Sequence, residues 1–193
     1  AIACGGASQS APPPDTAPAS SVARSEPAPI GGCAAAGSGE ELRTSDVDDD
    51  GRPEVCKYYR TIDDPERPGQ QKSRLVRQDV DVNGDGKVDI KRLFDETGQA
   101  TREEWDTDYD GRGDEVRPYE DGDIVRSERD QDNDGQMEVV RYYEEGKLER
   151  KETDTNGDGQ TDRWEYFEGR VLDRVGVDED HDGKVDSWAK AQS

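Results

Sequence analysis

The chain of 193 residues carries 48 acidic and 26 basic side chains, which give a formal net charge of −22. This charge repels nucleic acid and anionic membrane surfaces and attracts cations, so a nucleic-acid-binding function is excluded. Leu, Ile, Val and Phe account for 27 of the 193 residues, too few for an ordinary hydrophobic core. A bound metal ion is therefore expected to contribute part of the folding free energy. The sequence contains no run of 18 apolar residues, so it predicts no membrane-spanning helix.

The N-terminal residues Ala1-Ile2-Ala3-Cys4 resemble the end of a bacterial lipoprotein signal, in which small residues precede a cysteine that is lipidated after cleavage. The resemblance implies that residues 1–4 are the remnant of such a signal. It implies a lipid anchor on Cys4, export to the bacterial outer surface, and no other contact with a membrane. The alternative is a chance cysteine near the start of the chain.

Residues 5–40 are rich in Ala, Pro, Ser and Gly and include the run Pro12-Pro13-Pro14. This composition predicts a disordered, semi-extended linker ahead of a repeat domain at residues 41–193. The remaining cysteines, Cys33 and Cys56, are an even pair. In an exported protein such a pair predicts one disulfide, the alternative being two free thiols.

From residue 46 the chain repeats the pattern D-x-[DN]-x-D-G-x-x-[DE] six times. The copies begin at Asp46, Asp81, Asp106, Asp130, Asp154 and Asp178, with spacings of 35, 25, 24, 24 and 24 residues. A fixed period near 24 residues is typical of a repeat architecture. The first unit contains an insertion of about eleven residues, from Arg60 to about Gln71, which predicts a lengthened loop.

Between acidic loops, each unit has a short segment with an aromatic residue, an acidic residue followed by Gly, and a second short segment. Segments of this length with Gly turns predict β-hairpins. The expected fold is all-β, an elongated array of about 24-residue hairpins arranged as an antiparallel meander or a β-solenoid of eleven strands. The acidic loops are expected on one edge and the Gly turns on the other. Short helices, for example at Leu148–Glu152, are the second interpretation.

The acidic loops have the residue types that calcium requires, because this ion takes six to eight oxygen ligands in a flexible shell. Carboxylates or amides at positions 1, 3 and 5 can face inward, and Gly at position 6 permits the chain to reverse its direction. The backbone carbonyl of position 7 can then face the ion, and an acid at position 9 completes the set of oxygen ligands. The predicted ligands for up to six Ca²⁺ are Asp46, Asp48, Asp50, Arg52 and Glu54; Asp81, Asn83, Asp85, Lys87 and Asp89; Asp106, Asp108, Asp110, Arg112 and Asp114; Asp130, Asp132, Asp134, Gln136 and Glu138; Asp154, Asn156, Asp158, Gln160 and Asp162; and Asp178, Asp180, Asp182, Lys184 and Asp186.

These loops resemble the first half of an EF-hand loop and, more closely, thrombospondin type 3 repeats, which use D-x-D-x-D-G-x-x-D in tandem. The Glu that closes an EF-hand at position 12 occurs only at Glu165, and the cysteines usual between thrombospondin type 3 loops are almost absent. The resemblance covers residues 46–188 and implies calcium binding. Magnesium fits these loops less well, because it requires a small octahedral shell. Zinc is not expected, because the sequence contains no cluster of Cys and His residues.

Three further features permit two interpretations each. The acids two residues before four of the loops either add a ligand or are ordinary exposed acids; they are Asp79, Glu104, Glu128 and Glu152. The triplet Arg112-Gly113-Asp114 spells a receptor-recognition motif, but Asp114 is also a predicted ligand. The tryptophans and tyrosines pack across strands or, as the second interpretation, line a sugar-binding face.

No motif of a nucleophile, phosphate loop or metalloprotease is present, so the protein is expected not to be an enzyme. The sequence predicts a calcium-binding structural repeat protein of the bacterial surface, in which calcium stabilises a β-rod. The last unit stops after one strand, at Val185–Ala189, and an open strand edge there predicts a homopolymer or filament. The alternatives are a calcium-dependent adhesin or a carbohydrate- or protein-binding module and, less favoured, a hydrolase.

Overall fold

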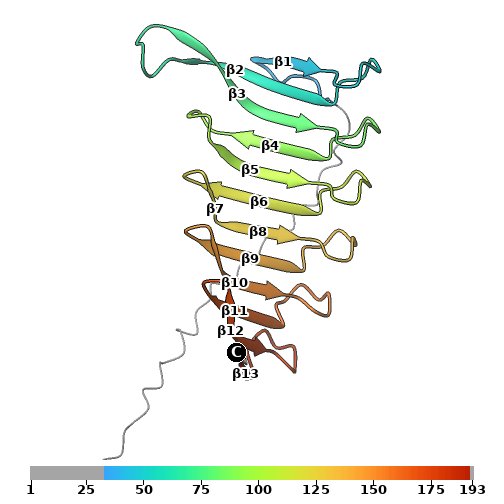
Figure 1. Ribbon diagram of the computed structural model, residues 1–193, viewed down its shortest axis with the longest axis vertical. Coiled ribbons are helices and arrows are strands. Elements are labelled where there is room, and N and C mark those ends of the chain that lie inside the picture. Colours follow the sequence, from blue (N-terminus) through green and yellow to red (C-terminus); the bar gives the residue numbers. More distant parts are fainter. Residues whose placement is uncertain (1–32, 192–193) are drawn as a thin grey trace, which may run out of the picture.

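The computed structural model describes residues 33–191, which form one antiparallel sheet of thirteen strands (Figure 1). Strands pair in chain order, except that the short β7 pairs only with β6 beside the main path. The strands are β1 (Glu40–Ser45), β2 (Val55–Asp63), β3 (Gln71–Val80), β4 (Ile90–Phe94), β5 (Ala100–Trp105), β6 (Glu115–Glu120), β7 (Asp123–Ile124), β8 (Arg126–Arg129), β9 (Val139–Glu144), β10 (Lys147–Thr153), β11 (Arg163–Glu168), β12 (Val171–Val177) and β13 (Ser187–Lys190). The predicted lipid anchor at Cys4 and linker residues 5–32 lie outside the described residues.

The prediction of an elongated all-β repeat array is confirmed, and of the two predicted arrangements the sheet is the open meander. The helical interpretation of Leu148–Glu152 is wrong, because this segment lies in β10 and pairs with β9 and β11. Within residues 33–191, no helix has the length and apolar character needed to cross a bilayer.

The structure has two strands more than the eleven predicted. β1 was missed because Glu40–Ser45 contains no aromatic or β-branched run that distinguishes it from the linker. β7 arises because Val125 interrupts the return strand of the third hairpin. The insertion at Arg60–Gln71 is also only partly a loop, since β2 extends to Asp63 and β3 begins at Gln71. The insertion thus lengthens a hairpin, whose end is closed by a bond from Asp64 N to Gln70 O of 2.8 Å.

Two of the hairpin turns show why Gly stands at the second position of the turn. Asp121 and Gly122 have φ angles of 51° and 91°, and Glu145 and Gly146 have φ angles of 49° and 72°. Two successive positive φ angles are the geometry of a type I′ turn, whose twist matches that of the flanking strands. The second position tolerates little but Gly, so the chain can reverse within two residues.

One face of the sheet carries a column in which, from β2 to β12, Tyr, Leu or Pro on the first strand of each hairpin alternates with Arg on the return strand. The register aligns Leu42, Tyr58, Arg77, Leu93, Arg102 and Pro118, and then Arg126, Tyr142, Arg150, Tyr166, Arg174 and Lys190. The Arg77 guanidinium lies 3.9 Å from the Tyr58 ring centroid, and that of Arg150 lies 4.2 Å from the Tyr142 ring centroid. Such stacking covers apolar rings with charged groups that remain hydrated.

The acids two residues before the loops belong to this face, and the interpretation of them as ordinary exposed acids is wrong. Each pairs with the arginine two residues earlier on its own strand, at 2.7 Å, 2.7 Å, 3.3 Å and 3.1 Å for Arg77–Asp79, Arg102–Glu104, Arg126–Glu128 and Arg150–Glu152. On β12 the acid is replaced by Gly176, where an added Cβ would lie 3.0 Å from the Trp188 ring. These acids are therefore structural partners of arginine.

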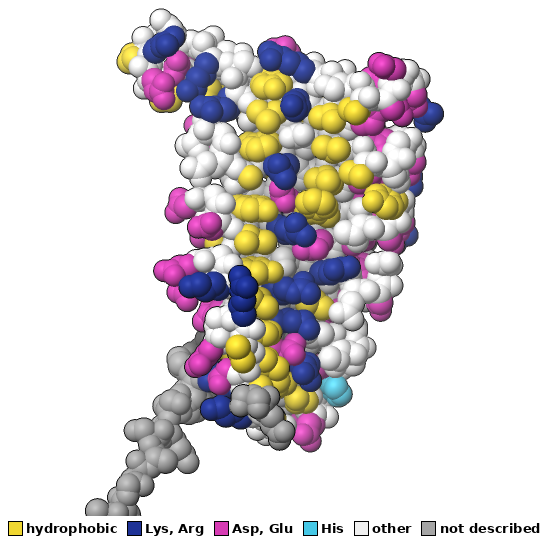
Figure 2. All heavy atoms as spheres, in the orientation of Figure 1, with side chains coloured by type: hydrophobic (Ala, Val, Ile, Leu, Met, Phe, Trp, Pro, Cys, Tyr) yellow, Lys and Arg dark blue, Asp and Glu magenta, His cyan; other side chains and the backbone are white. Residues whose placement is uncertain are grey.

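The hydrophobic core is thin because a single sheet has no second layer to cover it. Figure 2 shows hydrophobic side chains gathered in two columns across the strands, with charged side chains between them. Only four hydrophobic residues are fully buried among the described ones, namely Cys56, Tyr58, Val88 and Val139. Trp105 lies beneath the Arg117 guanidinium at 4.8 Å, and Trp188 lies 5.8 Å from Tyr166. Cross-strand packing of aromatics is thus observed.

Candidate metal centre

Six acidic loops lie along one edge of the sheet, and the hairpin turns lie along the other, as predicted (Figure 1). Loops one to six are residues 46–54, 81–89, 106–114, 130–138, 154–162 and 178–186, and each joins the return strand of one hairpin to the first strand of the next. In five loops the position-9 N–H donates to the carbonyl of the residue before position 1, as from Asp114 N to Trp105 O at 2.7 Å. This bond closes each loop at its base.

The position-1 carboxylate organises the interior of every loop. In loop three, Asp106 Oδ2 accepts from Gly111 N at 2.7 Å and Asp106 Oδ1 accepts from Tyr109 N at 2.7 Å. The bond from the position-6 Gly to position 1 recurs in all six loops at 2.6–2.8 Å. The curl that brings the later carboxylates inward is therefore built into the backbone.

The carboxylate at position 9 accepts hydrogen bonds from position 2 and so joins the two ends of the loop. Asp114 Oδ2 accepts from Thr107 N at 2.6 Å and from Thr107 Oγ1 at 2.8 Å, and Asp162 Oδ2 accepts from Thr155 in the same way. In all six loops the position-2 N–H donates to this carboxylate. Position 2 is not part of the acidic template, so the role of the Thr hydroxyls there could not be predicted from it.

Each loop contains two residues in the left-handed conformation, at positions 4 and 6. Only the Gly at position 6 was predicted from the sequence. The position-6 glycines have φ between 85° and 97°. Position 4 is left-handed as well, with φ of 62° at Asp49, 66° at Tyr109, 63° at Asn133 and 60° at His181. The signal was available in the sequence of five loops, where position 4 is Asp, Asn, His or Gly, the residues that most readily adopt this conformation; Tyr109 in loop three is the exception.

Carboxylate oxygens converge in five of the six loops. Among residues 33–191, at least three oxygens lie within 4.8 Å of one another in the groups Asp46, Asp48, Asp50 and Glu54; Asp81, Asp85 and Asp89; Asp106, Asp108 and Asp114; Asp130, Asp132, Asp134 and Glu138; and Asp178, Asp180 and Asp186. The predicted ligands Asp110 and Asp182 are outside these groups, and loop five forms no such group. The predicted ligand at position 7 is the backbone carbonyl. The position-7 side chains pair with the position-5 carboxylates of their own loops, in Arg52, Lys87, Arg112 and Lys184.

Loop five also differs in that a side chain from loop six reaches into it. His181 Nδ1 lies 2.9 Å from Asp162 Oδ1, at position 9, and 2.9 Å from the side-chain nitrogen of Asn156, at position 3. The acidic template carries no sign of this contact, because the contact depends on how neighbouring loops stack.

The structure removes the receptor-recognition interpretation of Arg112-Gly113-Asp114. The Asp114 side chain is buried, with 3 % of the residue exposed, and its carboxylate is bonded within loop three. A receptor that reads this triplet requires an accessible carboxylate.

Burial of clustered carboxylates makes loops two, three and four electrostatically costly. Desolvation raises the pKa of Asp89 above its ordinary value, and the neighbouring Asp81 and Asp85 add to this shift. Burial also raises the pKa of Asp106 and of Glu138. A divalent cation held among these oxygens would offset both the desolvation and the like-charge repulsion.

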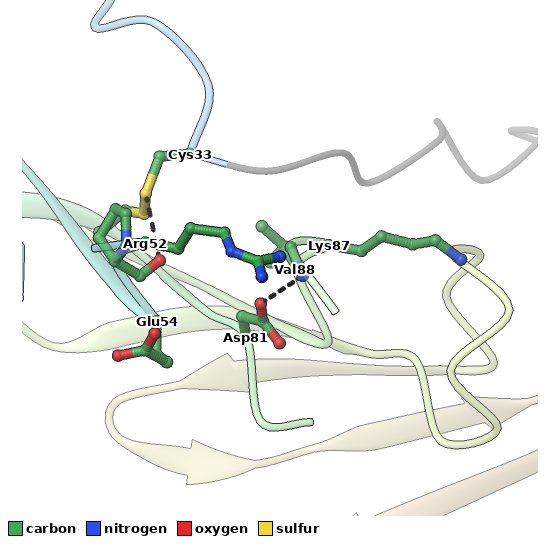
Figure 3. A pocket seen from close by; sticks show the side chains of 9 residues that line it. Cys33, Arg52, Glu54, Asp81, Lys87 and Val88 are labelled. Carbon is green, nitrogen blue, oxygen red and sulfur yellow. Dashed lines mark hydrogen bonds between the residues drawn. A yellow bond between two sulfur atoms is a disulfide. The ribbon is translucent and has the colours of Figure 1, made fainter. Parts of the chain in front are cut away.

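A disulfide lies beside the first two loops. Cys33 and Cys56 are joined in the structure, with their Cα atoms 5.8 Å apart, and they line a hollow of about 180 Å³ with Arg52, Asp81 and other residues of loops one and two (Figure 3). Tyr58 OH donates to Ala34 O at 2.9 Å, so the segment before β1 crosses the sheet and covers this tyrosine.

We expect the position-6 glycines to be required for backbone reasons alone. An added Cβ at Gly135 meets nothing within 4 Å, yet φ is 92°. Gly135→Val should destabilise the folded protein by about 1–2 kcal/mol, because a branched side chain strongly disfavours this conformation. Gly135→Asn is the matched control, since Asn tolerates positive φ. Urea unfolding followed by circular dichroism measures both, and equal midpoints for the two variants would contradict this account.

Comparisons with known proteins identify no family for this chain. No family model and no curated protein matches it. Among solved structures, it is similar to accessory secretory protein 1, 2 and 3 of Streptococcus pneumoniae, with a TM-score of 0.42 and 12 % identity, covering 69 % of this chain and 23 % of that one. A glycosylation-associated protein complex of Streptococcus agalactiae gives a TM-score of 0.33 and 14 % identity, covering 72 % and 22 %. The chain spans less than a quarter of those proteins, and nothing about its function is drawn from them.

Proposed function

We propose that this protein binds calcium through its six acidic loops and that calcium is a structural component of the sheet. The observation that carries the proposal is the convergence of at least three carboxylate oxygens within 4.8 Å in five loops along one edge. With six ions bound, the formal charge would change from −22 to −22 + 12 = −10. As an extracellular module it is expected to bind with dissociation constants on the order of 10⁻⁴ to 10⁻³ M.

The donor set favours calcium over other divalent ions. The clusters offer carboxylate oxygens only, whereas structural zinc sites use Cys and His. Magnesium requires a near-ideal octahedron and gives up its water reluctantly, while calcium accepts irregular shells with many carboxylates. The loop backbone supports such a shell, because the N–H groups at positions 2, 4 and 6 fix the orientation of the carboxylates at positions 1 and 9.

The biological role we propose is structural rather than catalytic, at the bacterial surface, with the protein anchored through a lipid on Cys4. The thin core and the row of acidic loops support a rod that requires calcium. A calcium-dependent adhesin or a sugar- or protein-binding module is the second candidate, favoured by the partly exposed Trp188 beside Tyr166 and Arg174.

Self-association is part of this proposal. Within residues 33–191, β1 and β13 each pair with one neighbouring strand, and all four residues of β13 are exposed. Unpaired strand edges recruit further strands, so calcium should promote growth in particle size. Sedimentation velocity at millimolar calcium tests this expectation, and a single monomer boundary at all protein concentrations would contradict it.

Calcium stoichiometry tests the binding function. Equilibrium dialysis with metal analysis should give about six Ca²⁺ per chain at saturation, one for each acidic loop. The double substitution Asp132→Asn/Asp134→Asn should remove one ion. The control Asp121→Asn/Asp123→Asn removes the same charge from a hairpin turn at the opposite edge and should leave the count unchanged. Equal ion counts for the two variants, or saturation by magnesium at the same concentration, would refute calcium binding by the loops.

A further inference from the structure

We infer that calcium binding is positively coupled between neighbouring loops, because the residue that closes one loop also holds the first ligand of the next. This inference rests on the proposed function and adds to it how the sites regulate one another. It predicts that the array loads cooperatively from loop to loop.

The coupling follows from backbone hydrogen bonds between loops. At every junction, the N–H of position 1 donates to the carbonyl of position 9 in the preceding loop. The five bonds are Asp81 N to Glu54 O at 2.8 Å, Asp106 N to Asp89 O at 2.7 Å, Asp130 N to Asp114 O at 2.8 Å, Asp154 N to Glu138 O at 2.9 Å, and Asp178 N to Asp162 O at 2.8 Å. The predicted closing ligand of one site and the predicted first ligand of the next are thus adjacent in the ladder.

The position-9 residue connects three elements at once, as Asp114 shows. Its N–H closes loop three by donating to Trp105 O, its carboxylate accepts from Thr107, and its carbonyl accepts from Asp130 of loop four. Asp114 and Asp130 are 3 % and 4 % exposed. Water therefore does not readily replace these bonds, and immobilising Asp114 restricts Asp130.

Restricting Asp130 in turn prepares loop four for an ion. Asp130 Oδ1 accepts from Asn133 N and Asp130 Oδ2 accepts from Gly135 N, each at 2.7 Å. A loop whose first ligand and left-handed turn are already ordered loses less conformational entropy when it binds. Binding at loop three should consequently raise the affinity of loop four.

Side chains reinforce two junctions. Lys87 Nζ of loop two donates to Asp110 O of loop three at 3.2 Å. At the junction of loops five and six, His181 contacts Asp162 and Asn156, each at 2.9 Å. These contacts join neighbouring loops along the same edge as the backbone bonds.

Repulsion between bound ions opposes the coupling but is screened. Successive loops are two strands apart, about 10 Å at the usual strand spacing. This separation is about one Debye length at physiological ionic strength, so the repulsion between exposed sites is weakened by salt. Ordering through buried backbone hydrogen bonds is not screened, and the net coupling at physiological salt should be positive.

The test uses the full chain and calcium alone, with the six loop glycines as separate reporters in amide NMR spectra. These are Gly51, Gly86, Gly111, Gly135, Gly159 and Gly183. In the unchanged protein, their calcium titrations should have Hill coefficients above 1. In Asp132→Asn/Asp134→Asn, Gly135 should no longer respond, while the midpoints of Gly111 and Gly159 should rise about tenfold and that of Gly51 should stay within about twofold.

The Asp132→Asn/Asp134→Asn variant distinguishes the effect of ordering loop four from the effect of its net charge on the neighbouring loops. Loop four with calcium carries −4 + 2 = −2 from Asp130, Asp132, Asp134, Glu138 and the ion, and the variant without calcium retains −2 from Asp130 and Glu138. Neighbouring loops thus experience the same local net charge. The amides replace carboxylates of the same shape, so the Oδ1 acceptors for Asp134 N and Gln136 N are retained.

The outcomes distinguish the coupling from calcium binding itself. Independent sites would give unshifted midpoints at Gly111 and Gly159 and Hill coefficients of 1 in the unchanged chain, and either result overturns the coupling while leaving calcium binding intact. If no glycine amide of the unchanged chain responds to millimolar calcium, the proposed function fails and the coupling fails with it. An unfolded variant does not prevent the test, because the Hill coefficients come from the unchanged chain.

Discussion

Removal of calcium with excess chelator is expected to unfold the repeat sheet or to lower its melting temperature by tens of degrees. A ligand that binds only the folded state stabilises it by about 2.7 kcal/mol when its concentration is a hundredfold above the dissociation constant. Several loaded loops would together contribute about 10 kcal/mol or more, comparable to the whole stability of an ordinary domain.

The structural reason for so large an effect is the thin core. Only Cys56, Tyr58, Val88 and Val139 are fully buried hydrophobic residues in the described chain. Buried acids are more numerous than buried apolar residues, and they include Asp89, Asp106, Asp114 and Asp130. Without a cation, desolvation and mutual repulsion of these acids oppose folding, so the same residues that stabilise the loaded sheet destabilise the unloaded one.

Thermal unfolding monitored by circular dichroism measures this effect in buffers of equal ionic strength with calcium or with chelator. A third sample with chelator and excess magnesium separates specific binding from simple charge screening, and it should resemble the calcium-free sample. Superimposable melting curves with and without calcium would show that the sheet folds without metal.

Loss of the Cys33–Cys56 disulfide is expected to cost about 3 kcal/mol of unfolding free energy, the amount that chain-entropy arguments give for a cross-link across 23 residues. The effect is large relative to the limited core. The disulfide holds the segment that covers Tyr58, which is 0 % exposed and whose hydroxyl donates to Ala34 O. Its loss also frees this segment from the first hairpin.

Urea unfolding at saturating calcium compares the unchanged chain with Cys33→Ala/Cys56→Ala. Cys4→Ser is the control, since it removes the other cysteine without touching the pair, and its midpoint should equal that of the unchanged chain. Treatment of the unchanged protein with reductant should reproduce the loss without any substitution. A variant midpoint equal to the control would mean that Cys33 and Cys56 contribute nothing to stability.

The sequence by itself determined the parts of this protein that depend on local geometry. The template D-x-[DN]-x-D-G specifies a loop because its carboxylates cap N–H groups only two to five residues away, as Asp106 does for Tyr109 and Gly111. The Gly turns, such as Asp121-Gly122, specify hairpins for the same reason. Repetition of both every 24 residues led to the antiparallel meander.

Only the tertiary structure decided what lies between neighbouring units. The stacking of Arg77 on Tyr58 depends on the register of β2 with β3, and the contact of His181 with Asp162 depends on adjacent loops facing each other. The bonds from position 1 to position 9 of the preceding loop likewise arise from strand register. Such contacts join residues 15 or more positions apart through the sheet, a distance over which a local pattern carries no information about alignment. The physical link between one acidic loop and the next is therefore a property of the assembled sheet.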